Sequence, residues 1–153
     1  MVRLVRVASP LTLGLALWFL SGCGSSGGGA ATGGDKVERA QSIALSQVGD
    51  LLRVRAEEGS KPPTKAADLA KYEKAFPVGY PKVKSGEIVL FLDTPLDEAA
   101  SDKVLAYEKQ VPESGGLVLM QDGKTTQKMT ADEFKAAPKA GTNASAPVSG
   151  KAK

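Results

Sequence analysis

The longest amphipathic pattern in the chain lies over residues 35–58. Apolar residues recur there at spacings of three and four, and two more widen the stripe: Val37, Ala40, Ala44, Val48, Leu51 and Val54, with Ile43 and Leu52. This spacing is that of a helix with one buried face. Asp35 is placed to cap its start and Gly59 to end it, so we expect a long helix whose stripe packs against a core.

Shorter elements follow this helix. The prolines at 62–63 force extended backbone, and Thr64 is placed to cap a second, short helix over residues 65–75. Proline and glycine residues over 77–81 predict a loop. The two helices are therefore joined and followed by irregular segments.

After the loop the period changes to that of β-strands. The run EIVLFL at 87–92 is continuously apolar, which is typical of a strand buried on both faces. Residues 103–109 alternate, which predicts Val104 and Ala106 on one face and Leu105 and Tyr107 on the other.

The strongest turn signal is Asp122-Gly123, which lies between apolar runs at 117–121 and 124–129. This pattern predicts a hairpin with a type I′ turn, in which both central residues have positive φ. Thr130 and Glu133 have the spacing of a capping box, which predicts a last helical turn with Phe134 packed on the sheet.

These elements predict an α+β domain over residues 35–136. In it, a long N-terminal helix and a short helix pack on a small, mostly antiparallel sheet of three to four strands. Residues 137–153 have no apolar periodicity, and we expect them to form a disordered tail.

Residues 1–22 have the parts of a lipoprotein signal peptide. Two arginines precede an apolar run over 11–20, which is shorter than the roughly 20 residues needed to span a bilayer. The sequence Leu20-Ser21-Gly22 then precedes Cys23 and resembles a lipobox. An ordinary signal peptide with a stray cysteine, or a short uncleaved anchor, are the alternatives.

The lipobox resemblance implies that the chain is a bacterial lipoprotein, with diacylglycerol and an N-acyl chain such as palmitate on Cys23. Residues 23–34 are rich in glycine and serine, and a tether of this kind reaches about 20 Å. The protein is then anchored in a membrane of the cell envelope and faces the periplasm or the exterior. The resemblance favours the outer membrane in a diderm cell, because Gly24 and not Asp follows the cysteine.

Charge and composition exclude several functions. Five of the 20 Lys and Arg residues lie in the two end segments, which leaves 15 against 17 Asp and Glu in the predicted domain. A domain whose positive and negative charges are this nearly equal has no electrostatic field strong enough to attract nucleic acid. The chain has no histidine, and Cys23 is its only cysteine, so the commonest general base and a cysteine zinc site are both missing. We therefore expect a protein that is not an enzyme and carries no cofactor besides its lipid.

One acidic loop is a candidate for metal binding. Asp93, Asp97 and Asp102 follow the apolar strand, together with Glu98, and oxygen-rich loops of this kind can bind calcium. The loop lacks the alternate-position ligands and the central glycine of an EF-hand. A solvated acidic loop is the favoured interpretation, and the three aspartates remain weak calcium candidates.

Three stretches resemble type IV pilin-like and type II secretion pseudopilin-like proteins. A helix ending in QVGDLL leads through GSKPP to Asp68-Leu69, LAYE precedes a proline, and GGLVLMQDG is followed by a methionine and a capping box. The resemblance implies a pilin-like head. The chain departs from the family at its start, where it lacks the peptidase site, the early glutamate and the membrane-spanning helix, so the pilus-assembly function is not carried over.

We therefore expect a non-catalytic, lipid-anchored envelope protein whose head contacts another envelope protein. A small-ligand or calcium-binding periplasmic module is the alternative. A ligand module requires a concave pocket, whereas an interaction protein is expected to expose an apolar patch or a strand edge.

Overall fold

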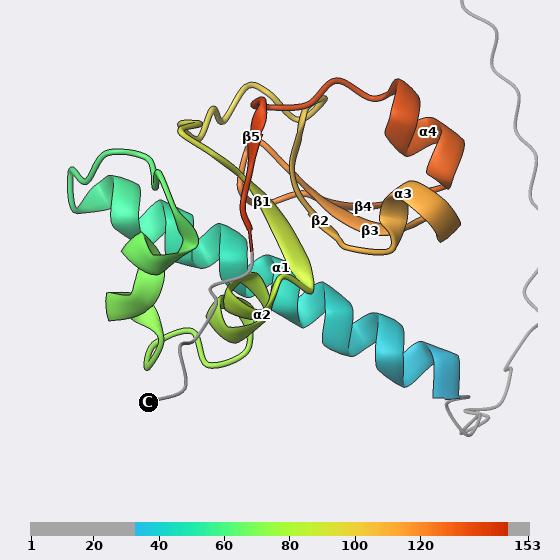
Figure 1. Cartoon of the computed structure of the whole chain (residues 1–153), viewed down its shortest axis with the longest axis horizontal. Helices are drawn as coiled ribbons and strands as arrows, with labels where there is room; N and C mark the ends of the chain where they lie inside the picture. The colour runs from blue at the N-terminus through green and yellow to red at the C-terminus, as the bar shows by residue number, and fades with distance from the viewer. Residues whose placement is uncertain (1–32, 147–153) are drawn as a thin grey trace, which may run out of the picture. The chain divides into compact units, whose positions relative to one another are not determined.

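The structure, a computed structural model, describes residues 33–146. The predicted signal peptide, the lipobox, Cys23 and most of the tether lie outside the described residues. The elements in chain order are α1 (Gly33–Glu57), the 3-10 helix η1 (Ala66–Tyr72), α2 (Gly79–Ser85), β1 (Ile88–Leu92), β2 (Val104–Glu108), α3 (Val111–Ser114), β3 (Gly116–Met120), β4 (Thr126–Met129), α4 (Ala131–Ala136) and β5 (Asn143–Ala144) (Figure 1).

The strands form one antiparallel sheet in the order β4-β3-β2-β1-β5. Strands β1 to β4 follow one another as a meander, and β5 pairs with the outer edge of β1. The prediction of an α+β domain with an antiparallel sheet is confirmed. The sheet has five strands and not three to four, because the chain returns to it after α4.

This return corrects the predicted boundary of the disordered tail. Residues 137–146, which we expected to be disordered, take part in the fold. The amide of Val104 donates to the carbonyl of Pro138, and Leu92 and Phe91 pair with Asn143 and Ala144. The segment lacks apolar periodicity because its backbone, and not its side chains, makes these contacts.

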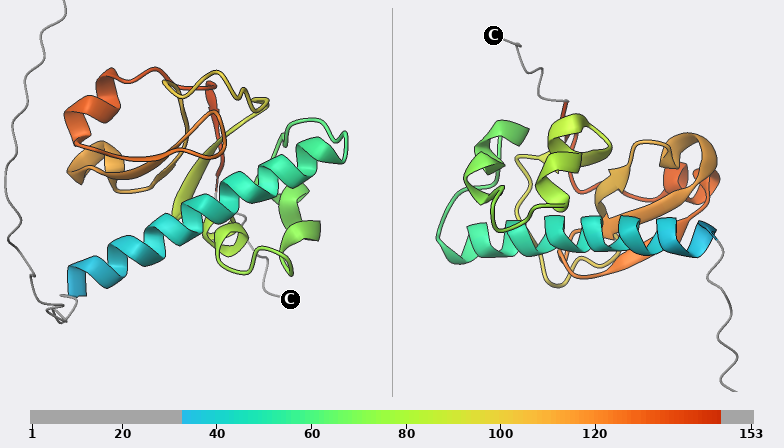
Figure 2. Two further views of the ribbon diagram at one scale, coloured as in Figure 1. Left: turned by 180° about the vertical axis from the view of Figure 1, so that it is seen from behind. Right: turned by 90° about the horizontal axis from the view of Figure 1, so that it is seen from below.

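Both faces of the sheet are buried, which explains the continuous apolar run of β1. One face packs against α1, α2 and η1. The cluster between them includes Leu45, Val48 and Leu51 of α1, together with Ile88, Leu90, Leu105 and Leu119 of the sheet. The other face is covered by α3 and α4, with a smaller cluster of Phe91, Val104, Val111, Val118, Met120, Met129 and Phe134. Figure 2 shows α1 lying along one side of the sheet and α4 on the other.

A β-bulge in β2 overturns the predicted alternation of this strand. The pairing with β3 shifts between Val104 and Ala106. The side chains of Leu105 and Ala106 consequently join the same cluster, on the α1 side, while Val104 and Tyr107 belong to the other. An extra residue in one strand of an antiparallel pair has this effect, and no local sequence signal marks it.

The predicted loop over 77–81 is wrong in part, because α2 begins at Gly79. Pro81 lies in its first turn, where a missing amide removes no helical hydrogen bond. The side-chain oxygen of Gln47 in α1 accepts from the amides of Val78 and Gly79, at 2.9 and 3.0 Å. A residue more than thirty positions earlier therefore caps this helix.

The hairpin of β3 and β4 forms at Asp122-Gly123 as predicted, but its turn is not type I′. Gly123 has φ +68°, whereas Asp122 is not among the residues with positive φ. The Asp122 carboxylate accepts instead from the amides of Lys124 and Thr125, at 2.9 and 2.8 Å. A side chain that bonds the backbone ahead of it stabilises a longer connection than a two-residue turn.

The capping box before α4 is confirmed. The Thr130 hydroxyl accepts from the amide of Glu133, and the Glu133 carboxylate accepts from the amide of Thr130. Phe134 is buried and packs beside the ring of Tyr107, with the ring centroids 4.7 Å apart. Within residues 33–146, no helix is both long and apolar enough to cross a membrane.

Candidate interaction surface

The three calcium candidates do not come together. Asp93 accepts from the side-chain amide of Asn143 at 3.2 Å, and Asp97 accepts from the backbone amide of Ala99 at 3.1 Å. Among the described residues, no group of three or more His, Cys, Asp and Glu side chains is placed to hold a metal ion. The acidic loop is arranged by contacts within the protein.

The first turns of α1 carry an exposed apolar patch, formed by Val37, Ala40 and Ile43. Val37 is 56% exposed and Ile43 is 54% exposed, and Ala40 is exposed as well. The stripe is fully buried from Ala44, the residue after Ile43. The stripe predicted from the sequence is thus continuous, but the core covers only its second half. Figure 2 (left) shows these first turns of α1 extending away from the sheet.

The patch is fixed to the sheet by an ion pair. Lys128 of β4 donates to the Glu38 carboxylate of α1 at 2.8 Å. A shallow hollow lies beside it, lined by Glu38, Arg39, Ser42 and Leu117. Glu38 therefore ties the first turns of α1, which carry the patch, to β4.

A surface pocket of about 280 Å³ lies at the opposite end of α1. Its walls come from three segments: the last turns of α1, the turn containing Pro62 and Pro63, and the loop 94–96 after β1. Arg55 lies at the pocket, and its guanidinium donates to the carbonyl oxygens of Lys61 and Asp68. The pocket is mainly apolar, and its volume is near the lower end for ligand sites.

Glu108 is a buried carboxylate beside a second, smaller pocket. It is 6% exposed, and its carboxylate accepts from the amide of Leu117 at 3.2 Å. Burial raises the pKa of Glu108, against the hydrogen bond from Leu117, which lowers it. The pocket is about 190 Å³ and is lined in addition by Lys82 and Glu87, which form an ion pair at 2.6 Å.

This arrangement gives Glu108 a structural role. The carboxylate lies against Gly116 and bonds the first amide of β3 after it. It thereby joins the end of β2 to the start of β3 across α3. A perturbed carboxyl pKa is one mark of an active site. The pKa of Glu108, however, is raised by the burial of its side chain within its own sheet.

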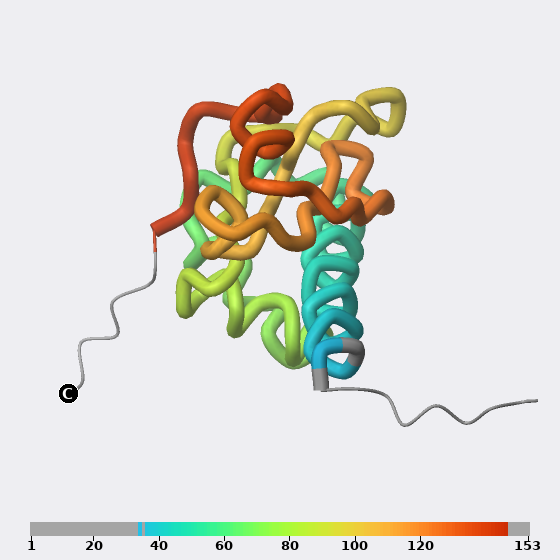
Figure 3. Tube along the Cα trace, turned by 90° about the vertical axis from the view of Figure 1, so that its right-hand side faces the viewer, coloured from blue at the N-terminus to red at the C-terminus, as the bar shows by residue number. Residues whose placement is uncertain are grey.

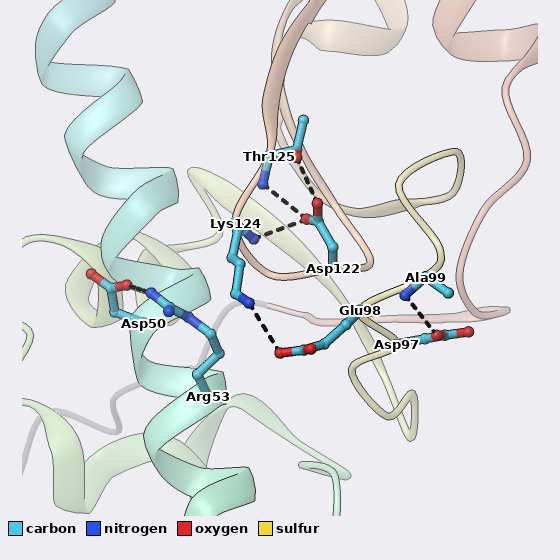
Figure 4. A network of polar contacts seen from close by, with 8 residues as sticks. All are labelled: Asp50, Arg53, Asp97, Glu98, Ala99, Asp122, Lys124 and Thr125. Carbon is cyan, nitrogen blue, oxygen red and sulfur yellow. Dashed lines mark hydrogen bonds and ion pairs between the residues drawn. The ribbon is translucent and has the colours of Figure 1, made fainter.

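A network of polar contacts holds the tip of the β3–β4 hairpin (Figure 4). Lys124 donates to Glu98 of the acidic loop at 3.0 Å, and the Thr125 hydroxyl donates to Asp122 at 2.5 Å. Burial raises the pKa of Asp122, but hydrogen bonds from Thr125 and Lys124 together outweigh it, so that the pKa of this carboxyl lies below its ordinary value. In α1, Arg53 pairs with Asp50. The acidic loop therefore contacts the tip of the hairpin through Glu98.

The two edges of the sheet differ. At one edge, β4 exposes Gln127 and Lys128, and a lysine on an edge strand disfavours pairing with another chain. At the other edge, the apolar strand β1 is covered by β5. The amide of Leu90 donates to the Ser145 hydroxyl at 2.9 Å, and the amide of Ser145 donates to the carbonyl of Leu90 at 2.7 Å.

No protein-family model matches the sequence, and neither a curated protein nor a solved structure matches the chain.

Three residues of this description were not found by sequence reasoning. Gln47 caps a distant helix, Glu108 joins two strands, and Ser145 closes the edge of β1. Glu108 is a charged residue within the alternating strand predicted over residues 103–109, and this is a local signal that its side chain has a partner. Gln47 and Ser145 bond partners far away in the sequence, and no pattern in the neighbouring residues indicates these contacts.

Proposed function

We propose that this protein is a non-catalytic, lipid-anchored protein of the cell envelope whose head is an interaction module. The observation that carries the interaction role is the α1 apolar patch of Val37, Ala40 and Ile43. Two exposed branched apolar side chains on one short stretch of helix lose water contact when a partner covers them, which favours binding.

The sequence alone supports the lipid anchor. The lipobox Leu20-Ser21-Gly22 precedes Cys23, and α1 begins ten residues after that cysteine. A lipid on Cys23 would hold the first turns of α1, and with them the patch, within reach of the membrane surface. A partner anchored in the same membrane would then meet the patch at a high effective concentration.

A pilin-like arrangement of the head is the finer part of this proposal. In its support, the helix α1 comes first, packs on one face of the sheet, and is followed by a meander of four antiparallel strands. A long helix followed by such a meander is the order that the pilin resemblance implies. The proposal concerns the head alone and carries no role in pilus assembly.

The anchor is tested by metabolic labelling with a clickable palmitate, followed by fractionation of the cell envelope. The natural chain is expected to take up label and to fractionate with a membrane, and the outer membrane in a diderm cell. Cys23→Ser is expected to take up no label and to accumulate as the precursor. Label on both chains, or on neither, would overturn the lipoprotein assignment.

The interaction role is tested separately by photo-crosslinking in cells. A photoreactive amino acid at Val37 or Ile43 is expected to give one discrete adduct at both positions, because both side chains lie in the patch. The control position is Lys74, which is exposed in the segment after η1. The role fails if Val37 and Ile43 give no adduct, or if Lys74 gives the same one.

A small-ligand module is the second candidate, and the pocket at the end of α1 is the observation that favours it. Its apolar walls are stiffened by three prolines, Pro62, Pro63 and Pro95. Screening for compounds that raise the melting temperature tests it. A true pocket ligand should lose its effect in Ala56→Trp, which fills the pocket, and keep it in Ala75→Trp, which changes an exposed residue outside the pocket.

A further inference from the structure

The outer edge of β1 is covered by a short segment with unusual contacts. We call residues 141–146, which contain β5, the C-terminal strap. Figure 3 shows it (red) running down one side of the domain, opposite α1. Its strand pairs with β1 at only two positions, Phe91 with Ala144 and Leu92 with Asn143. It is the shortest strand of the sheet that the structure describes.

The strap is held by its backbone, by the Ser145 hydroxyl and by a hydrogen bond from the Asn143 side-chain amide to Asp93, and hardly by apolar packing. Asn143 and Ala144 are both exposed. Ser145 is buried, and it satisfies both the amide and the carbonyl of Leu90, the first by its hydroxyl and the second by its own amide. Hydrogen bonds without apolar burial give a segment little net stability, so the strap is expected to open more readily than the rest of the sheet.

The strand that the strap covers, β1, is apolar and firmly paired on its other side. Residues Ile88–Leu92 are all apolar, and on the other side β1 is paired with β2 at Ile88, Val89 and Leu90. Opening the strap therefore leaves a strand that is ordered by its inner neighbour and has unpaired backbone groups on its outer side. Such an edge is a template for a further strand.

We propose that the outer edge of β1 is a strand-acceptor site, and that the C-terminal strap occupies it until an extended segment of a partner protein replaces it. The strap itself defines the chemistry of that segment. The partner strand runs antiparallel to β1, carries no charge, and places a serine or threonine opposite Leu90 and a small or apolar residue opposite Phe91.

An apolar residue at the position of Asn143 or Ala144 would give the partner an advantage over the strap. It would keep the backbone hydrogen bonds to β1 and add apolar contact that the strap lacks. This inference goes beyond the interaction role proposed above, because it places a second binding surface at the edge of β1 and not at the α1 apolar patch. It does not depend on the lipid anchor, since β1 and the strap need no membrane to exchange strands.

The test uses the full chain in detergent and, as the probe, a fluorescein-labelled synthetic peptide of residues 139–146, followed by anisotropy. Ser145→Ala removes the acceptor of the Leu90 amide and should loosen the strap. It is therefore expected to bind the peptide about tenfold more tightly than the natural chain does. Thr142→Ala is the matched control, because Thr142 is exposed in the same segment, and it should bind like the natural chain.

A peptide with proline in place of the serine lacks the amide that bonds Leu90, and it is expected not to bind. Equal affinity of all three proteins, or no binding to Ser145→Ala, would overturn the proposal. If Ser145→Ala becomes a dimer and ignores the peptide, the edge accepts a second copy of this chain, and the proposed partner is wrong.

Amide hydrogen exchange of the natural chain gives a second measurement that needs no variant. The Leu90 amide is held only by Ser145, so it should exchange well before the amide of Leu119, which lies within the interior strand β3. Equal rates at both amides would mean that the strap opens only on global unfolding, and the proposal would fail. Failure of the palmitate label would remove the anchor and leave this exchange untouched, so the two outcomes are distinguishable.

Discussion

The helix residue Gly49 lies against the carbonyl group of Gly123, at the tip of the β3–β4 hairpin. A Cβ atom on Gly49 would meet that carbonyl oxygen well inside van der Waals contact. Gly123 has φ +68° and packs against the side chain of Leu96. One glycine in the helix and one in the turn thus allow the hairpin to touch the backbone of α1, which sets the position of the helix on the sheet.

This contact predicts a large effect of a small substitution. Gly49→Ala should lower the free energy of unfolding by about 2 kcal/mol, because overpacking against backbone outweighs the gain of roughly 1 kcal/mol in helix propensity. Gly34→Ala is the matched control, since Gly34 lies in the same helix with nothing within 4 Å of its Cβ position. It should be neutral or slightly stabilising. Urea unfolding measures both, and equal stabilities would refute the close packing.

The cap of α2 by Gln47 leads to a second prediction. Gln47→Ala leaves the amides of Val78 and Gly79 without their acceptor and should cost about 1 kcal/mol, the usual size of a lost helix cap. Ser46→Ala, which changes the exposed neighbour in α1, should leave the urea midpoint in place. Glutamate at 47 keeps an acceptor near the helix N-terminus, so Gln47→Glu should recover most of the stability. A full loss with Gln47→Glu would contradict the assignment.

Much of the sheet was predictable because its signals are local. The apolar run of β1, the Asp-Gly turn and the capping box of Thr130 and Glu133 each depend on residues within a few positions of one another. Such patterns determine the conformation of the neighbouring backbone, so they can be recognised without knowledge of the rest of the fold. For the same reason the sequence indicated a patterned helix stripe but not where the core stops covering it.

The parts that were missed depend on partners distant in the chain. The sequence predicts a loop at the start of α2 because the cap of this helix comes from Gln47, and it predicts a disordered tail at β5 because β1 supplies the pairing of that strand. The bulge between Val104 and Ala106 is set by β3. In each case a tertiary contact stabilises the element. The residues of the element itself show no preference for that structure.

The Asp122 turn gives a third prediction. Asp122→Ala removes the acceptor of the Lys124 and Thr125 amides and should destabilise the domain by roughly 1 kcal/mol. Asp122→Asn keeps one oxygen for these amides and should lose less. The two variants are compared by thermal unfolding at neutral pH. Equal losses in the two variants would mean that the charge of the carboxylate, and not its hydrogen bonds, holds the turn.

Glu108 and Glu133 should make opposite contributions to the pH dependence of stability. Burial raises the pKa of Glu108 above its ordinary value of 4.5, so its contribution is fully present below that value and is lost as the pH rises through the folded-state pKa. Hydrogen bonds from Thr130 lower the pKa of Glu133, so its contribution is present above 4.5 and is lost as the pH falls through the folded-state pKa.

Glu108→Gln should therefore raise the urea midpoint at pH 7, since the amide oxygen still accepts from Leu117 while the buried charge is gone. The gain should shrink toward pH 4, where Glu108 of the natural chain is already protonated. Glu133→Gln is the control of opposite sign, and it should lower the midpoint at pH 7 and matter less at pH 4. If Glu108→Gln lowers the midpoint at pH 7, the charge of Glu108 stabilises the fold, with Lys82 of the same pocket as its nearest cationic neighbour on α2.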